Sequence, residues 1–150
     1  MRPQIKIIIA TVIVSTVLAF GSHVAIQGWE DKISSANEQL FEVAKNKDKL
    51  GVDVILVAGS TAILPVLASY FVLYAIWGSI PGRKWWQKGL VFSLLLLVIK
   101  SNLIREPVMG VLMEVPVWLV IAKQLDVWVP NIILGLVLAW GVRQHRGKNA

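Results

Sequence analysis

The stretch IIIATVIVSTVLAFGSHVAIQ, residues 7–27, decides the fold class of this chain. It runs for 21 residues between Lys6 and Gly28 without an ionised side chain. At a rise of about 1.5 Å per residue, an α-helix of this length crosses a bilayer hydrocarbon core of roughly 30 Å. The sequence therefore predicts that this segment is a transmembrane helix.

A secretory signal peptide is the alternative for this first segment. Arg2 and Lys6 place positive charge in front of the apolar run, as in a signal peptide. However, the run is longer than a typical signal-peptide core, and no clear small-x-small cleavage site follows it. We therefore expect an uncleaved signal anchor that spans residues 7–28.

Composition supports a membrane class for the whole chain. Of its 150 residues, 56% are hydrophobic and only 16% are charged, whereas a soluble domain carries about a quarter charged residues. The apolar residues form blocks, and three further blocks predict spans at 54–79, 86–104 and 127–142. Pro65 lies inside the second block and is expected to kink that helix. We predict an all-α integral membrane protein built as a bundle of four transmembrane helices.

The distribution of charge orients the predicted spans. If the amino terminus is cytoplasmic, the outer segments carry all nine acidic residues, and every charged residue of the inner segments is basic. The inner basic residues are Arg2, Lys6, Arg83, Lys84, Lys88, Arg143, Arg146 and Lys148. Because cytoplasmic loops carry an excess of Lys and Arg, we expect a bacterial-type inner-membrane protein with both termini in the cytoplasm. This asymmetry explains the net charge of +6 without a nucleic-acid partner.

Tryptophans lie near the ends of the predicted spans. Six of the seven fit this pattern, namely Trp29, Trp77, Trp85, Trp86, Trp128 and Trp140. Indole rings prefer the membrane–water interface, so anchoring is the favoured role. Binding of a quinone or sterol by these rings is the alternative.

Small residues recur at four-residue spacing on three of the predicted spans. They are Thr11, Ser15 and Ala19 on the first, Ala58 and Ala62 on the second, and Gly135 and Ala139 on the last. Small residues let helix backbones approach closely inside a membrane. The spacing predicts close helix contacts within a bundle or an oligomer.

The predicted outer loop, residues 30–53, contains a short amphipathic helix. Ser35 and Glu38 have the spacing of a capping box, and Gly51 is a natural stop. We expect this helix to cover the bundle or to lie on the outer surface. A docking surface for another protein is the alternative.

Residues 105–126 fit no simple span. The segment is apolar, but three helix-disfavouring residues interrupt it, Pro107, Gly110 and Pro116. A fifth span would place the basic carboxy terminus outside, so we reject it. A long tilted helix from Pro116 to Val142 is an alternative, but it puts Lys123 and Asp126 in the hydrocarbon, where a lone charge costs about 2.5–3.5 kcal/mol. We favour an interfacial or re-entrant segment on the outer side, before the last span.

The candidate site is a polar cluster around this segment. Its members are Lys100, Asn102, Arg105, Glu106, Glu114, Lys123 and Asp126. Ionisable residues at membrane depth often mark a substrate path or a partner's charge. Structural pairing of the basic side chains with the carboxylates is the favoured alternative. His23, on the first span, is either a proton-relay group or an interfacial histidine with a satisfied hydrogen bond.

The sequence contains no recognisable catalytic motif. It has no cysteine, and its two histidines lie far apart, so we expect neither a cofactor nor a metal. It has no Gly-rich phosphate loop and no Ser–His–Asp set at usable spacing, so we expect no enzyme.

The function that we predict is protein–protein contact. Small membrane proteins of this kind act as accessory or assembly subunits, or as immunity or exclusion proteins, which is an argument by analogy. The partners would be the lipid bilayer and another membrane protein or a second copy of the chain. The alternative is a small transporter or channel subunit with a polar path through the Lys100–Asp126 cluster. An enzyme that handles a lipid or a quinone is a more distant third.

Overall fold

The computed structural model describes most of the chain, and the described part is all-helical. The described residues are 3–35, 52–100, 104, 107–108, 112 and 117–147. Within these ranges there is no strand, and the helices are α1 (Pro3–Ser35), α2 (Val52–Ile76), α3 (Trp85–Ile99) and α5 (Val117–Gly147). Ser35, which was expected to cap a separate amphipathic helix, is instead the last residue of α1, so α1 takes up residues 30–35 of the predicted outer loop. The rest of that predicted helix lies outside the described residues, as do Asn102, Arg105, Glu106 and Glu114 of the predicted cluster.

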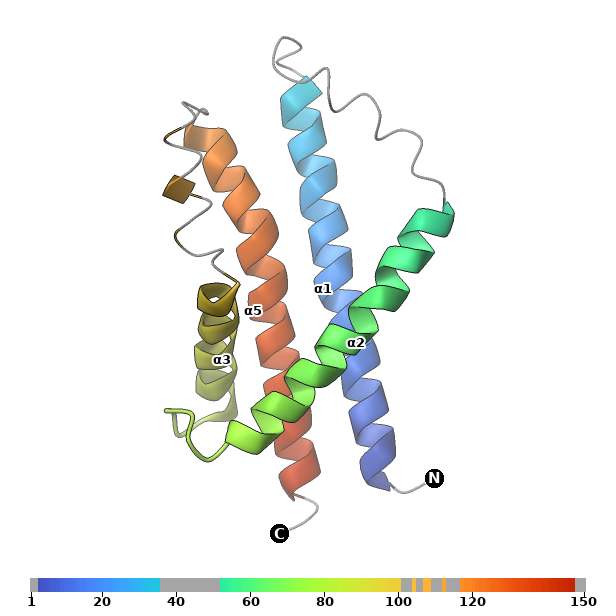
Figure 1. Ribbon diagram of the computed structural model, residues 1–150, viewed down its shortest axis with the longest axis vertical. Coiled ribbons are helices and arrows are strands. Elements are labelled where there is room, and N and C mark those ends of the chain that lie inside the picture. Colours follow the sequence, from blue (N-terminus) through green and yellow to red (C-terminus); the bar gives the residue numbers. More distant parts are fainter. Residues whose placement is uncertain are drawn as a thin grey trace.

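The helices alternate in direction along the chain (Figure 1). Both termini lie at the same end of the molecule, together with the turn between α2 and α3. Helix α5 packs against each of the other three helices, and α1 also packs against α2. Toward its amino-terminal end, α2 diverges from α1 (Figure 1).

Two of the described helices are long and apolar enough to cross a membrane. They are α1 over Gln4–Trp29 and α5 over Val117–Gly147, whose most apolar 18-residue windows have mean hydropathies of 2.1 and 1.8. The described parts of α2 and α3 contribute shorter apolar helices, Ala62–Ile76 and Trp85–Ile99. Large apolar side chains face outward on all four helices; Val17, Leu64, Ile99 and Ile121 are all more than half exposed. Such faces suit lipid better than water and support a membrane location.

Helix α5 corrects the predicted boundary of the last helix. The prediction assigned residues 105–126 to a separate interfacial or re-entrant segment, but residues 117–126 are the first turns of one continuous helix that ends at Gly147. Pro116 directly precedes this helix in the sequence, and proline is well tolerated at a helix start. The prediction began the last helix after Asp126, because a charged side chain is costly in an apolar environment. The structure instead gives Asp126 a partner on another helix.

The other helix boundaries differ less from the prediction. Helix α1 extends beyond 7–28 at both ends, and α3 ends at Ile99, five residues before the predicted end. Pro65 lies inside α2 as expected, and α5 also contains a proline, Pro130.

The turn between α2 and α3 is shaped by Gly82, which has a φ of 127°. This left-handed conformation favours glycine, because a Cβ there would be strained. After it, the Gln87 side chain accepts hydrogen bonds of 3.0 Å from the backbone N–H groups of Arg83 and Lys84. The Lys88 ammonium donates a hydrogen bond to the Trp77 carbonyl and lies 5.1 Å from the centre of the Trp77 ring. Together these contacts fix the reversal of the chain between the two helices.

Small residues set the closest approach between helices. A Cβ added to Gly135 of α5 would lie 2.7 Å from the carbonyl oxygen of Gly89 on α3 and would overlap the Ser93 side chain. Elsewhere along α5, a Cβ added to Gly141 would overlap the side chain of Thr11 on α1. The small residues singled out at Thr11 and Gly135 thus lie at two of the close helix contacts.

The buried core lies where α1, α2 and α5 meet. Tyr70 and Leu73 of α2 and Leu138 and Val142 of α5 are fully buried, and Val12 of α1 is nearly so. Phe92 of α3 belongs to the same cluster of buried residues. Helix α5 therefore contributes to the core from its carboxy-terminal half, while its amino-terminal half contributes to the site described below.

We predict that Gly141→Ala and Gly135→Ala destabilise the protein, each by about 1–3 kcal/mol, because an added methyl group overpacks a close helix contact. The measurement is the free energy of unfolding of the purified protein in detergent micelles. Gly21→Ala is the matched control, because nothing lies within 4 Å of a Cβ at that position. There, alanine stabilises the helix by up to about 1 kcal/mol. Equal effects at all three glycines would contradict the close packing.

Candidate functional site

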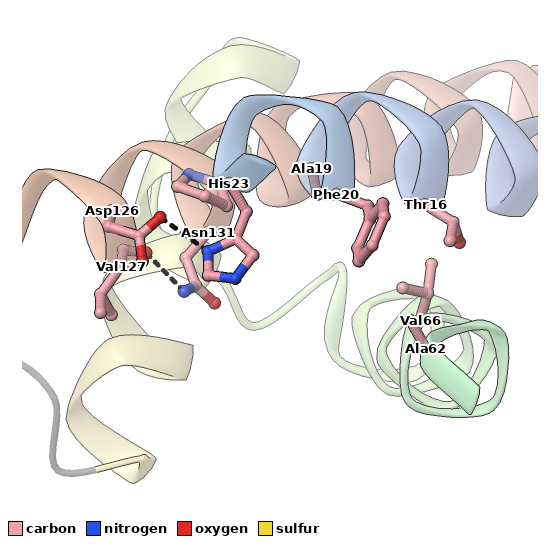
Figure 2. Close-up of a pocket in the computed structure, with 10 residues that line it drawn as sticks. Thr16, Ala19, Phe20, His23, Ala62, Val66, Asp126, Val127 and Asn131 are labelled. Atoms are coloured by element: carbon pink, nitrogen blue, oxygen red, sulfur yellow. Dashed lines mark hydrogen bonds and ion pairs between the residues drawn. The ribbon is translucent and has the colours of Figure 1, made fainter. Parts of the chain in front are cut away.

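A cavity of about 320 Å³ lies between α1, α2 and α5. Its polar lining residues include His23 of α1 and Asp126 and Asn131 of α5. Figure 2 shows these three side chains grouped together, with Phe20 and Val66 set apart from them. The cavity therefore has a polar end and an apolar end.

The polar end is built around a contact between His23 and Asp126. The Nδ1 atom of His23 lies 2.6 Å from Oδ1 of Asp126, so the ring N–H donates to the carboxylate and links α1 to α5. The Asp126 side chain is 13% exposed, whereas the His23 side chain is 39% exposed. A carboxylate that is largely removed from solvent needs such a partner, because an unpaired buried charge is costly.

Asn131 lies one helical turn beyond Val127 and is buried. Its side-chain amide donates to the Val127 carbonyl at 2.7 Å and accepts a hydrogen bond from the Lys100 ammonium at 3.3 Å. Lys100 caps the carboxy-terminal end of α3. The contact therefore links α3 to α5 beside the cavity.

The structure brings together only part of the predicted cluster. Lys100 and Asp126 both lie at this end of the molecule, but they bond to Asn131 and His23 rather than to each other. Lys123 is exposed on α5. Lys100 and Asp126 therefore each bond to another helix, but not in the predicted pairing of basic side chains with carboxylates.

Sequence reasoning missed two features of this site. It treated His23 as an isolated group rather than the partner of Asp126, and it did not select Asn131. A polar amide inside an apolar run, close to Asp126, was the available signal for Asn131. The sequence holds no comparable signal for the His23–Asp126 pair, because the two residues are 103 positions apart.

A second polar cluster lies near the other end of α5. The buried Tyr70 hydroxyl shares a hydrogen bond of 2.9 Å with Nδ1 of His145, and the Tyr74 and His145 ring centres lie 4.9 Å apart. The Arg146 guanidinium donates to the Tyr74 carbonyl at 3.3 Å and lies 5.3 Å from the centre of its ring. This cluster fastens α2 to α5 and does not line the cavity.

The chemistry available at the cavity is proton exchange and hydrogen bonding. An imidazole and a carboxylate in contact can hold a proton between them, and the imidazole can bond a further group. In the part of the chain that the structure describes, no group of three His, Cys, Asp or Glu residues could hold a metal ion. The arrangement suits proton exchange and hydrogen bonding to a small ligand.

We predict that His23 and Asp126 are energetically coupled. In a double-mutant cycle with His23→Ala and Asp126→Ala, the coupling should be about 1–2 kcal/mol, since a hydrogen bond to a charged group is worth about 1.5–3 kcal/mol when buried and less when partly exposed. The readout is the free energy of unfolding in detergent.

The matched control is the cycle that pairs Asp126→Ala with His145→Ala, which removes the other histidine. The two residues bond to different partners, so their effects should add to within about 0.5 kcal/mol. Additive effects of the His23 and Asp126 substitutions would show that the contact contributes nothing.

Comparison with known proteins assigns the chain to no family. No family model, no curated protein and no solved structure matches it. The function of the chain is therefore inferred from its own residues and their geometry.

Proposed function

We propose that this chain is a four-span inner-membrane protein with both termini in the cytoplasm. The four described helices alternate in direction, which supports four crossings (Figure 1). The end that holds both termini and the α2–α3 turn is also the basic end, where Arg83, Lys84, Arg143 and Arg146 lie. An excess of basic residues on one side is typical of the cytoplasmic face.

We further propose that the protein works through contacts with another membrane protein or with a second copy of itself, without catalysis. The observation that supports this proposal is that polar side chains on the described helices bond to one another within the chain. The paired side chains His23–Asp126, Lys100–Asn131 and Tyr70–His145 each join two helices of the same chain. What remains for another molecule on the described helices is mainly apolar surface, the kind through which membrane helices associate. An accessory, assembly, immunity or exclusion role fits such a surface.

A small transporter or channel subunit is the second candidate. It is favoured by the His23–Asp126 pair, because ionisable side chains beside a cavity in an apolar bundle often form part of a proton or solute path. Lys100, bonded to Asn131, extends this polar region to α3.

The topology can be tested with introduced cysteines, because the natural sequence contains none and gives no background labelling. We predict that Lys47→Cys reacts with a membrane-impermeant maleimide in intact cells, whereas Arg83→Cys and Arg143→Cys react only after the membrane is opened. Labelling of all three in intact cells, or of none in opened cells, would contradict the four-span arrangement.

The two functions can be separated with Asp126→Asn and Lys100→Ala. If the protein works by contact, purification in mild detergent should recover a stoichiometric membrane partner or a defined oligomer, and reconstituted vesicles should show no flux. If it is a transporter, the wild-type protein alone should move protons or a solute. Each variant should then abolish that flux while the protein still accumulates in the membrane. The measurements are mass spectrometry of the purified complex and flux into proteoliposomes.

A further inference from the structure

We propose that the cavity between α1, α2 and α5 binds the head group of a lipid-soluble quinone, with His23 as the residue that hydrogen-bonds its ring oxygen. This site goes beyond the function by contact and rests on the proposed membrane location. Three properties of the cavity carry the proposal: its size, its polarity and the direction of the His23 ring.

The size of the cavity favours a single ring. Its volume is about 320 Å³, near the lower end of the roughly 300–1,000 Å³ range of ligand pockets. Apart from Thr16, the walls away from the polar end are apolar, and Phe20 offers an aromatic ring against which a flat ring can pack.

The polarity of the lining points to His23 as the contact for a ligand. The Thr16 hydroxyl donates to the Val12 carbonyl, and both ends of the Asn131 amide are engaged. In Asp126, the oxygen Oδ1 bonds to Nδ1 of His23. In an imidazole, the two nitrogens face in different directions, and Figure 2 shows the second ring nitrogen of His23 turned away from Asp126. This atom, Nε2, is the group that a ligand can reach.

The chemistry of Nε2 fits a quinone head group in both of its forms. When His23 is protonated beside Asp126, Nε2 carries a hydrogen and donates to a carbonyl oxygen. When His23 is neutral and donates from Nδ1, Nε2 accepts a hydrogen bond from a hydroxyl group. A quinone presents carbonyls on its ring, and the corresponding quinol presents hydroxyls at the same positions.

The opening of the cavity gives the tail of such a ligand a route to the bilayer. The cavity is largely open rather than enclosed, and α1 and α2 both line it. A head group seated against His23 can therefore keep an isoprenoid tail in the lipid.

The test is equilibrium binding of radiolabelled decylubiquinone to the full chain in nanodiscs of phosphatidylethanolamine and phosphatidylglycerol. The wild-type protein should bind the probe saturably, at one molecule per chain. His23→Leu removes the hydrogen bond and should weaken binding at least tenfold. Ala62→Trp, which fills the apolar wall without touching the polar pair, should weaken it to the same extent. His145→Leu is the matched control and should bind as the wild type does, because His145 lies outside the cavity.

The outcomes separate the ligand site from the membrane proposal. Saturable binding that both cavity variants lose and that an excess of diacylglycerol does not displace supports the quinone site. Wild-type binding no greater than that of empty nanodiscs overturns it. Binding by His23→Leu and Ala62→Trp that is as strong as wild-type binding, with normal helical content in the discs, also overturns it. Displacement by diacylglycerol also overturns it, because it assigns the cavity to an acyl lipid. A wild-type chain that does not enter nanodiscs contradicts the membrane location itself.

Discussion

The structure depends on one steric constraint, the close approach of α5 to two neighbouring helices. Gly135 leaves room for α3, and Gly141 leaves room for α1. In a membrane, helices gain nothing from removing apolar side chains from water, so their association depends on packing and on bonds between them. Two glycines on one helix make that packing possible and place α5 between its neighbours, in contact with all of them.

Hydrogen bonds made by side chains add to the helix packing that the glycines allow. The amino-terminal half of α5 is joined to α1 through Asp126 and to α3 through Asn131, and its last turns are joined to α2 through His145 and Arg146. Each bond satisfies a polar group that would otherwise be costly inside an apolar bundle. The helix that carries most of the contacts thus also carries one partner of each of these polar links, and the cavity lies beside one of them.

Some of this could be predicted from the sequence, and the rest could not for physical reasons. Helical class follows from uninterrupted apolar runs such as residues 7–27, because only their length and hydropathy matter. The start of α5 was placed wrongly because the cost of Asp126 was judged without its partner. Pairing between residues 103 positions apart depends on how helices pack, and that information is not local. Asn131 was overlooked for the same reason, since its importance comes from Lys100 on a different helix.

The attachment of α2 has a mechanical consequence. Its side-chain bonds to α5 involve Tyr70 and Tyr74, near its carboxy-terminal end, while its other end stands away from α1. Pro65 lies between these bonds and Ala62, so the bonds to α5 hold the part of α2 beyond its proline. At about 1.5 Å per residue, Ala62 lies about 12 Å along the helix from Tyr70. The part of α2 that carries the cavity wall at Ala62 is therefore joined to its bonded part across a proline, where helices most readily bend.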